Sequence, residues 1–306
     1  MSVRFGVSPI AWANDDMPEL GAETSVATIL AEAAEIGFAG VELGGRFPRD
    51  PAVLGPMLAR EGLALIGGWW STHLLDHGVE EEVEDLNSHL RLLQALGAPV
   101  FIAAECTRAV HGQRGASLNR RPRLSAGDWP RFGARLSALA AYTAERGLAF
   151  AYHFHLGTVV EDEDDLGRFL DATTDEVGLV VDTGHAAVAG VDAARLIGEH
   201  PGRVAHVHAK DVRGAVADRV RAEGRSFLDG VLGGMFTAPG DGDLDFAPVM
   251  RALADIGYRG WIVEEAEQDP ARADPNAYGR LGLATLQKAA AAAGLVPAPA
   301  AVEPHP

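Results

Sequence analysis

Short apolar runs rich in Val, Ile and Phe alternate eight times with longer stretches of helical periodicity along this chain of 306 residues. The expected strands are residues 3–10, 40–43, 63–70, 100–105, 149–155, 177–182, 204–208 and 261–265. The expected helices are residues 25–36, 51–60, 80–96, 128–146, 164–172, 193–199, 246–256 and 277–293. Strand and helix in regular alternation are typical of parallel strands joined by crossover helices. Eight such units predict an α/β protein with a closed (β/α)8 TIM barrel.

Glycines mark the helix ends. Gly37, Gly62, Gly97 and Gly147 each stand between an expected helix and the next strand, where glycine adopts the left-handed conformation at least cost. No linker rich in Pro, Gly or Ser divides the chain, so the sequence predicts one domain over residues 1–295. Residues 296–306 contain four prolines, and we expect this tail to be disordered.

Two connections, residues 106–127 and 211–245, are too long for simple turns. Both follow an expected strand, so a barrel would place them over the end where active sites form.

Two acidic runs, residues 80–85 and 161–165, open or precede helices. Carboxylates are favourable near helix N-termini, and we expect both runs to face water.

Charge and cysteine content narrow the classes of partner. The chain has 26 Lys and Arg against 43 Asp and Glu, a net charge of −17, which repels nucleic-acid phosphates and anionic lipids. No uncharged apolar run reaches the roughly 18 residues that a membrane span needs. We therefore expect no nucleic-acid partner and no membrane association. The single cysteine, Cys106, and a start without signal-peptide character favour the cytoplasm.

Imidazoles and carboxylates gather where the expected strands end. These residues are Glu42, Glu105, His153, His155, Asp182, His206, His208, Glu264 and Glu265, with His185 just beyond strand six. Side chains at the carboxyl ends of barrel strands converge on one small volume, where such groups are costly to bury unless they hold a cation. The sequence therefore predicts a divalent metal site. A nitrogen and oxygen donor set without thiolate suits Mn, Co, Fe or Zn better than Mg or Ca.

Six segments carry a family resemblance. They are GVSPIAWANDD at 6–16, AYHFHLGT at 151–158, VDTGH at 181–185, HVHAKDVR at 206–213, PGDG at 239–242 and GWIVEEAEQDP at 260–270. Together they resemble the myo-inosose-2 dehydratase family of the xylose isomerase-like TIM-barrel superfamily, and the likeness runs to about residue 295. The resemblance implies removal of water from 2-keto-myo-inositol (scyllo-inosose) to give 3D-trihydroxycyclohexane-1,2-dione in inositol catabolism. It also implies Co or Mn as the metal, and glutathione as a further cofactor.

The same resemblance implies a ligand set. The superfamily's motifs correspond to Asp182, His208 and Glu265 here. Strand phase favours His208 over His206 and Glu265 over Glu264, and a slip of one residue would reverse both choices. The superfamily usually has a glutamate at the end of strand five, where this chain has His153. His153 is therefore the expected fourth ligand, with His155 and Glu105 as alternatives.

Loss of water beside a ketone requires a base and an acid as well as a metal that polarises the carbonyl group. The candidates are His155, His185 and Lys210, with Glu105 behind them. Alternatively, His185 orients a metal ligand, and Lys210 pairs with Asp211.

The expected partner is a small cyclic polyol ketone. Trp12 and Trp69 are candidates for an apolar wall against its ring, together with Trp70, for which core packing is the alternative. Asn14 and Arg46, with Asp15 and Asp16, are candidates for hydrogen bonds to its hydroxyls, or else belong to loop structure. The sequence does not fix the oligomeric state and leaves a homo-oligomer open.

Three rival functions remain. A ketose epimerase or isomerase of the same superfamily would typically carry two opposed glutamate bases, one of them on strand five, where His153 stands. A non-catalytic sugar-binding barrel would have lost metal-binding residues, whereas Asp182, His208 and Glu265 are all present here. An apurinic endonuclease shares the superfamily, but its DNA partner conflicts with the charge of −17. Neither a P-loop nor a dinucleotide fingerprint is present, which argues against ATP and NAD.

Overall fold

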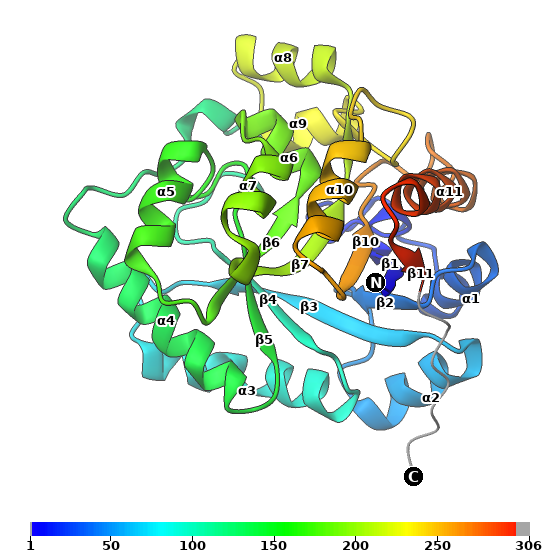
Figure 1. Ribbon diagram of the computed structural model, residues 1–306, viewed down its shortest axis with the longest axis horizontal. Coiled ribbons are helices and arrows are strands. Elements are labelled where there is room, and N and C mark those ends of the chain that lie inside the picture. Colours follow the sequence, from blue (N-terminus) through cyan, green and yellow to red (C-terminus); the bar gives the residue numbers. More distant parts are fainter. Residues whose placement is uncertain (1, 298–306) are drawn as a thin grey trace.

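The computed structural model describes residues 2–297 and shows a closed barrel of eight parallel strands surrounded by helices (Figure 1). The barrel strands follow one another in chain order, and β10 pairs with β1 to close the ring, with Phe5 opposite Ile262. They are β1 (Ser2–Val7), β2 (Gly40–Leu43), β3 (Ala64–Thr72), β4 (Val100–Glu105), β5 (Ala149–His153), β6 (Val177–Asp182), β7 (Val204–Ala209) and β10 (Trp261–Glu264). The (β/α)8 prediction is therefore confirmed.

The outer helices occupy the eight expected segments. They are α1 (Val26–Ile36), α2 (Pro51–Glu61), α3 (Val79–Ala95), α4 (Trp129–Ala144), α5 (Glu163–Ala172), α7 (Ala193–Glu199), α10 (Ala247–Asp255) and α11 (Pro275–Ala292). Their ends are set by local chemistry. Ser25 and Asp50, for example, cap α1 and α2 by accepting backbone N–H groups. All four glycines expected at helix ends have positive φ, between 68° and 110°.

Several short elements were not expected. They are α6 (Thr183–Ala189), α8 (Gly214–Ala222), α9 (Phe227–Leu232), and a two-stranded antiparallel pair of β8 (Asp211–Val212) and β9 (Phe236–Thr237). The first strand also ends earlier than expected, at Val7 instead of residue 10. Pro9 has no N–H to donate to a strand ladder, and it begins the 3-10 turn η1 (Pro9–Ala11).

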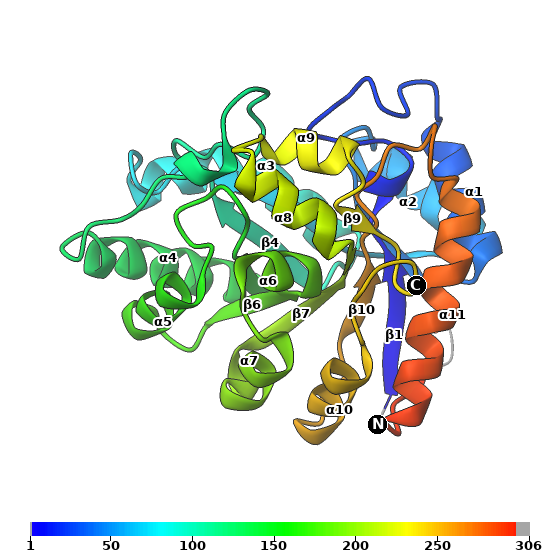
Figure 2. The same ribbon diagram turned by 90° about the horizontal axis from the view of Figure 1, so that it is seen from above.

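The two long connections lie over the carboxyl ends of the strands, as expected. Figure 2 shows α8, α9 and the connection after β4 at this end of the barrel, opposite the start of β1. These connections pack against one another through a separate apolar cluster. Its members Leu118, Leu156 and Phe227 come from three different connections. The barrel end is therefore covered by ordered loops with a core of their own.

The chain end differs from expectation where it is described. Val296–Pro297 form the short strand β11, which pairs with β1, although the disordered tail was expected to begin at residue 296. Residues 298–306 of that tail lie outside the described residues. Within residues 2–297, no helix combines the length and apolar character that crossing a bilayer requires.

Candidate metal centre

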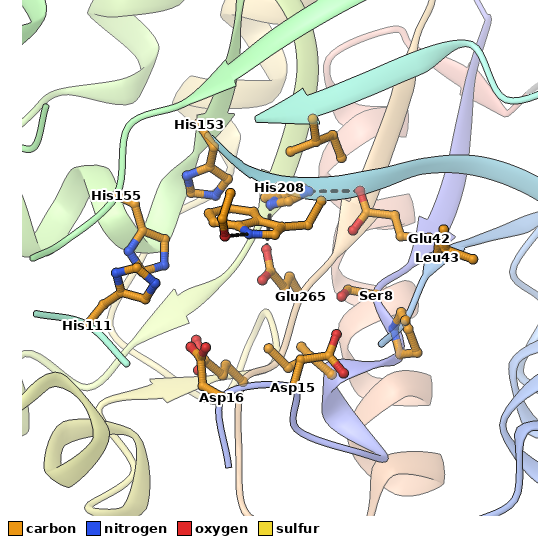
Figure 3. Close-up of a pocket in the computed structure, with 17 residues that line it drawn as sticks. Ser8, Asp15, Asp16, Glu42, Leu43, His111, His153, His155, His208 and Glu265 are labelled. Carbon is orange, nitrogen blue, oxygen red and sulfur yellow. Dashed lines mark hydrogen bonds and ion pairs between the residues drawn. The ribbon is translucent and has the colours of Figure 1, made fainter. Parts of the chain in front are cut away.

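Four side chains from four consecutive barrel strands meet at the carboxyl end of the barrel, and Figure 3 shows three of them, His153, His208 and Glu265. His153 ends β5, Asp182 ends β6, His208 lies on β7 and Glu265 follows β10. One ligand atom from each lies within 4.8 Å of the others, and all four side chains are buried. His153 Nε2 is 3.5 Å from Asp182 Oδ2, which is 3.6 Å from His208 Nδ1. Glu265 Oε2 lies directly against His208 Nδ1.

The free atoms of this group fit a cation. Asp182 Oδ2, His208 Nδ1 and Glu265 Oε2 are buried, and none has a hydrogen-bond partner within the described residues. Buried polar atoms almost always have a hydrogen-bond partner. Three neighbouring atoms without one are therefore best explained by a cation that binds all three. His153 Nδ1 donates to the Phe154 carbonyl (2.8 Å), which leaves Nε2 free on the side of Asp182. Two imidazole nitrogens and two carboxylates suit a divalent transition metal.

Strand register explains why the sequence brings these groups together. Asp182 is paired with His208 across β6 and β7, and Val263 is paired with His208 across β7 and β10. Glu265 points toward the group, whereas the buried Glu264 carboxyl faces Gly282 of α11. The choices of Glu265 over Glu264 and of His208 over His206 thus agree with the geometry.

Asp182 has two separate functions within the fold. Its Oδ1 accepts the backbone N–H of His185 (2.8 Å) and caps α6, while Oδ2 faces the centre. Burial raises the pKa of Asp182, but the Lys210 ammonium and His185 more than offset this, and the pKa lies well below its usual range. Asp182 is therefore an ionised ligand candidate.

A cavity of about 130 Å³ opens beside the centre. Its lining combines five carboxylates with four imidazoles and contains no lysine or arginine. The polar and aromatic residues of the lining are Ser8, Asp15, Asp16, Glu42, Trp69, Ser71, His111, His153, His155, His208, Glu265 and Glu267. Asp15 and Asp16 lie across the cavity from His208 (Figure 3). Such a lining suits an uncharged ligand rich in hydroxyls and opposes an anionic one.

His155 faces this cavity, and His185 lies behind it. Their ring centroids are 3.9 Å apart, and the His111 ring lies 4.8 Å from His155 on the cavity side. Burial lowers the pKa of His155 well below its usual value, and the nearby His185 and His111 lower it further. His155 is therefore neutral. His185 accepts the Leu156 N–H at Nδ1 (3.2 Å), and its Nε2 is 3.3 Å from Lys210 Nζ.

Lys210 is fully buried among carboxylates. Its Nζ lies 3.8 Å from Asp182 Oδ2, 3.4 Å from Glu265 Oε1 and 3.5 Å from Glu267 Oε2. Burial opposes its charge, but these carboxylates raise its pKa above the usual value. Its approach needs Gly184, because a Cβ there would lie 2.7 Å from Lys210 Cγ.

The alternative pairing of Lys210 with Asp211 is wrong. The Asp211 carboxylate instead accepts the backbone N–H groups of Gly240, Gly242 and Leu244.

Seven residues were candidates for substrate binding, and four of them, Trp12, Trp70, Asn14 and Arg46, lie outside the cavity lining. Trp12 is in the core and donates to Glu32 (2.6 Å), while Asn14 accepts the Met17 N–H (2.7 Å) within its own loop. Arg46 is exposed and donates to the Gly21 carbonyl (2.8 Å). The early end of β1 explains the error for Trp12, because it follows the turn η1 instead of ending a strand and packs in the core. Trp69, Asp15 and Asp16 do line the cavity, as expected.

The structure does not bring Glu105 to the site either. Its buried carboxylate accepts Thr72 Oγ1 (3.0 Å), the Leu74 N–H (2.8 Å) and the Thr107 N–H (2.9 Å). These bonds satisfy both oxygens outside the cavity. Glu105 is thus placed neither as the alternative fourth ligand nor as an acid or base behind the histidines. Trp70 packs against the core, which was the alternative for it, and donates to the buried Glu82.

Sequence reasoning did not name His111 or Glu267, and it placed Glu42 among the strand-end carboxylates without giving it a role. His111 lies in the long connection after β4, where no periodic pattern indicates which side chain turns inward. Glu42 was noted at a strand end, but its contact with β7 across the barrel has no signal in the sequence. Glu267 lies two residues beyond Glu265, and burial raises its pKa to about 8.

Comparison with known proteins agrees with this architecture. A family model described as the xylose isomerase-like TIM barrel matches residues 30–289. The rhizopine catabolism protein MocC of Rhizobium meliloti is 43% identical over 294 residues, covering 96% of this chain and 90% of that protein. An inosose dehydratase of Erwinia tasmaniensis is 43% identical over 279 residues, covering 90% and 94%.

Solved structures support the fold alone. A xylose isomerase domain protein from Alicyclobacillus acidocaldarius superposes with a TM-score of 0.68 at 22% identity, covering 96% of this chain and all of that one. An L-ribulose 3-epimerase gives a TM-score of 0.67 at 18% identity, covering 95% and 96%. The chain therefore belongs to the xylose isomerase-like TIM-barrel family, within the group that contains the curated inosose dehydratases.

Proposed function

We propose that this protein is a metal-dependent hydro-lyase of inositol catabolism that removes water from 2-keto-myo-inositol to give 3D-trihydroxycyclohexane-1,2-dione. One observation carries the proposal: a complete set of four ligands opens onto a cavity without cationic side chains, in a chain 43% identical to an inosose dehydratase. A neutral ring bearing a ketone and several hydroxyls suits this combination.

His153, Asp182, His208 and Glu265 would hold the ion, and the mixed donor set leads us to propose Mn or Co. When bound, a divalent ion supplies positive charge that polarises the ketone and stabilises the negative charge developing on its oxygen. Lys210 supports this arrangement from behind, because its ammonium keeps Asp182 and Glu265 ionised.

His155 is the proposed base. Its Nδ1 donates to the Leu156 carbonyl (2.8 Å), so in the neutral ring Nε2 is the unprotonated nitrogen, free to take the proton next to the ketone. His185 packs against His155 on the side away from the cavity and fixes the ring. His111 lies on the cavity side of His155, and burial lowers its pKa, so we propose that it relays the proton taken up by His155 to the departing hydroxyl, which leaves as water.

Ring hydroxyls would bind the acidic side of the cavity. Asp15 and Asp16 line the wall opposite the metal centre, and the Trp69 ring provides an apolar face whose centroid is 5.5 Å from that of His153. An acidic wall and an apolar face complement the proposed substrate, whose ring has polar hydroxyl edges and an apolar carbon face. A glutathione requirement and a cytoplasmic location stay predictions, and a homo-oligomer stays open.

The direct test is turnover by purified protein. The protein is stripped of metal, reloaded with Mn or Co, and incubated with scyllo-inosose while the dione is followed by its ultraviolet absorbance. We expect metal-dependent dione formation, reduced about 100-fold or more in His155→Gln. Absence of dione with every metal would reject the dehydratase. A new ketose formed from hexose substrates would establish the epimerase instead.

A further inference from the structure

Glu42, at the carboxyl end of β2, reaches across the barrel to β7. Its Oε1 is 2.8 Å from His206 Nε2 and 2.9 Å from His208 Nε2, and all three side chains are buried (Figure 3 shows the bond to His208). His206 and His208 can share one partner because alternate residues of a strand face the same side.

These bonds determine which nitrogen of His208 can bind a metal. An ionised carboxylate only accepts hydrogen bonds, so Nε2 of each ring must carry a proton. In the neutral His208 ring the lone pair then lies on Nδ1. That is the atom directed at Asp182 Oδ2 (3.6 Å) and Glu265 Oε2, and it has no hydrogen bond within the described residues.

The contact also fixes the orientation of the ring. An imidazole held only by its Cβ can turn about two side-chain bonds, whereas His208 is held at its far end by Glu42. His206 donates to the same oxygen and thereby holds Glu42 in place. Carboxylates that accept from a ligand histidine typically orient the ring and make it a better donor.

We propose that Glu42 is a positioning residue for the metal centre, which holds His208 in the Nε2-protonated form with Nδ1 facing Asp182 and Glu265. The proposal rests on the metal part of the proposed function and requires nothing of the substrate. Glu42 and the two histidines also lie close enough to form a second ion site, and the experiment separates that possibility.

The test measures metal binding instead of turnover. Metal-free protein is titrated with Mn²⁺, and the free ion is followed by its electron paramagnetic resonance signal. We expect the parent to bind one Mn²⁺ per chain and Glu42→Gln to bind 10- to 100-fold more weakly. Glu42→Asp keeps the charge but is too short to reach both rings, so its affinity should also fall. Thermal unfolding of each metal-free variant confirms that it is folded.

Glu264→Gln is the matched control. Glu264 is also a buried carboxyl at a strand end, but it faces α11 and does not touch the centre. Its Mn²⁺ affinity should equal that of the parent. The Co²⁺ absorption spectrum provides a second readout: in Glu42→Gln we expect it to change, because it reports ligand geometry, and in Glu264→Gln to stay the same.

Two results would overturn the proposal. One is parental Mn²⁺ affinity and an unchanged Co²⁺ spectrum in both Glu42 variants. The other is two ions bound per parental chain, which would make Glu42 a ligand instead of a positioning residue. If the parent binds metal but forms no dione, only the proposed dehydratase reaction fails, and the comparison of Glu42 variants still holds.

Discussion

Asp182 combines a helix cap and a metal ligand in one carboxylate, with Oδ1 on the His185 N–H and Oδ2 in the centre. Substitutions can separate the two functions. Asparagine caps helices as well as aspartate does, but it lacks the charge. We expect Asp182→Asn to lower metal-dependent turnover at least about 100-fold while the protein stays folded, as followed by steady-state kinetics and circular dichroism.

Asp182→Ala provides the comparison, because it removes both functions. Its free energy of unfolding should fall below that of Asp182→Asn by about 1 kcal/mol, the usual value of a cap. Parental activity of reloaded Asp182→Asn would remove Asp182 from the ligand set.

His89 of α3 makes stability depend on pH. It is 8% exposed, lies between Trp70 and Phe101, and has Nε2 at 3.3 Å from the Gly68 carbonyl. Burial lowers its pKa to about 4. Between pH 6.5 and 4 the unfolded chain therefore binds a proton that the native chain does not, and stability falls as the pH falls.

The shift corresponds to about 3 kcal/mol, which is fully present above pH 6.5 and lost by about pH 4. Urea unfolding at several pH values measures it. In His89→Leu the slope over this range should become shallower, whereas His200→Gln, at the end of α7, should keep the parental slope. Equal slopes in the parent and His89→Leu would contradict this assignment.

Single residues were predictable where strand geometry decides their direction. His153, Asp182, His208 and Glu265 end parallel strands, and the alternation of side chains is enough to make them converge. Trp12 and Asn14 follow a turn, where direction depends on a few backbone angles that no periodic pattern reports. Glu105 also ends a strand, but local N–H groups compete for its carboxylate.

At the scale of elements, a buried arginine joins the connection after β4 to the start of α5. The Arg121 side chain is 3% exposed and contacts Glu161 (3.4 Å) and Asp165 (2.6 Å). Glu161 also accepts the N–H of Gly157, in the loop that follows His155. The acidic run at 161–165 was expected to face water, and Glu161 and Asp165 are instead buried because Arg121 pairs with them.

Removal of Arg121 would leave Asp165 buried without a cationic partner, whereas Glu161 would keep Arg221 (2.6 Å). We expect Arg121→Met to lower the free energy of unfolding by about 3–5 kcal/mol, measured by urea unfolding. Arg123→Met is the control: Arg123 is 66% exposed and contacts Asp162 at 3.5 Å, so its removal should cost less than about 1 kcal/mol. A similar decrease in the free energy of unfolding in the two variants would show that the buried ion pairs of Arg121 do not stabilise these loops.

The elements that the sequence did not predict are short and depend on tertiary contacts. In α6 the first four residues are all buried, so the polar and apolar alternation of a surface helix is missing. The apolar residues of α9 pack against other loops, and β8 and β9 have two residues each. The eight outer helices are longer on average and are amphipathic, which is why their periodicity was visible.

At the scale of the whole molecule, the charge of −17 bears on how metal binding can be recognised. Any divalent cation reduces repulsion on so acidic a surface and stabilises the folded chain somewhat. A specific ion acts differently, since it binds the native centre and not the unfolded chain. At a free concentration of 100 times its dissociation constant, we expect it to raise the free energy of unfolding by about 2.7 kcal/mol.

Thermal unfolding distinguishes the two effects. With Mn²⁺ the melting temperature should rise by several degrees, follow a one-site binding curve, and return to its starting value with EDTA. Mg²⁺ at the same ionic strength gives the effect of charge screening alone, because a site with two imidazoles disfavours it. Asp182→Asn should lose the Mn²⁺-specific part and keep the screening part, since a single charge changes −17 very little. Equal shifts with Mn²⁺ and Mg²⁺ in the parent would mean that the four converging side chains do not form a metal site.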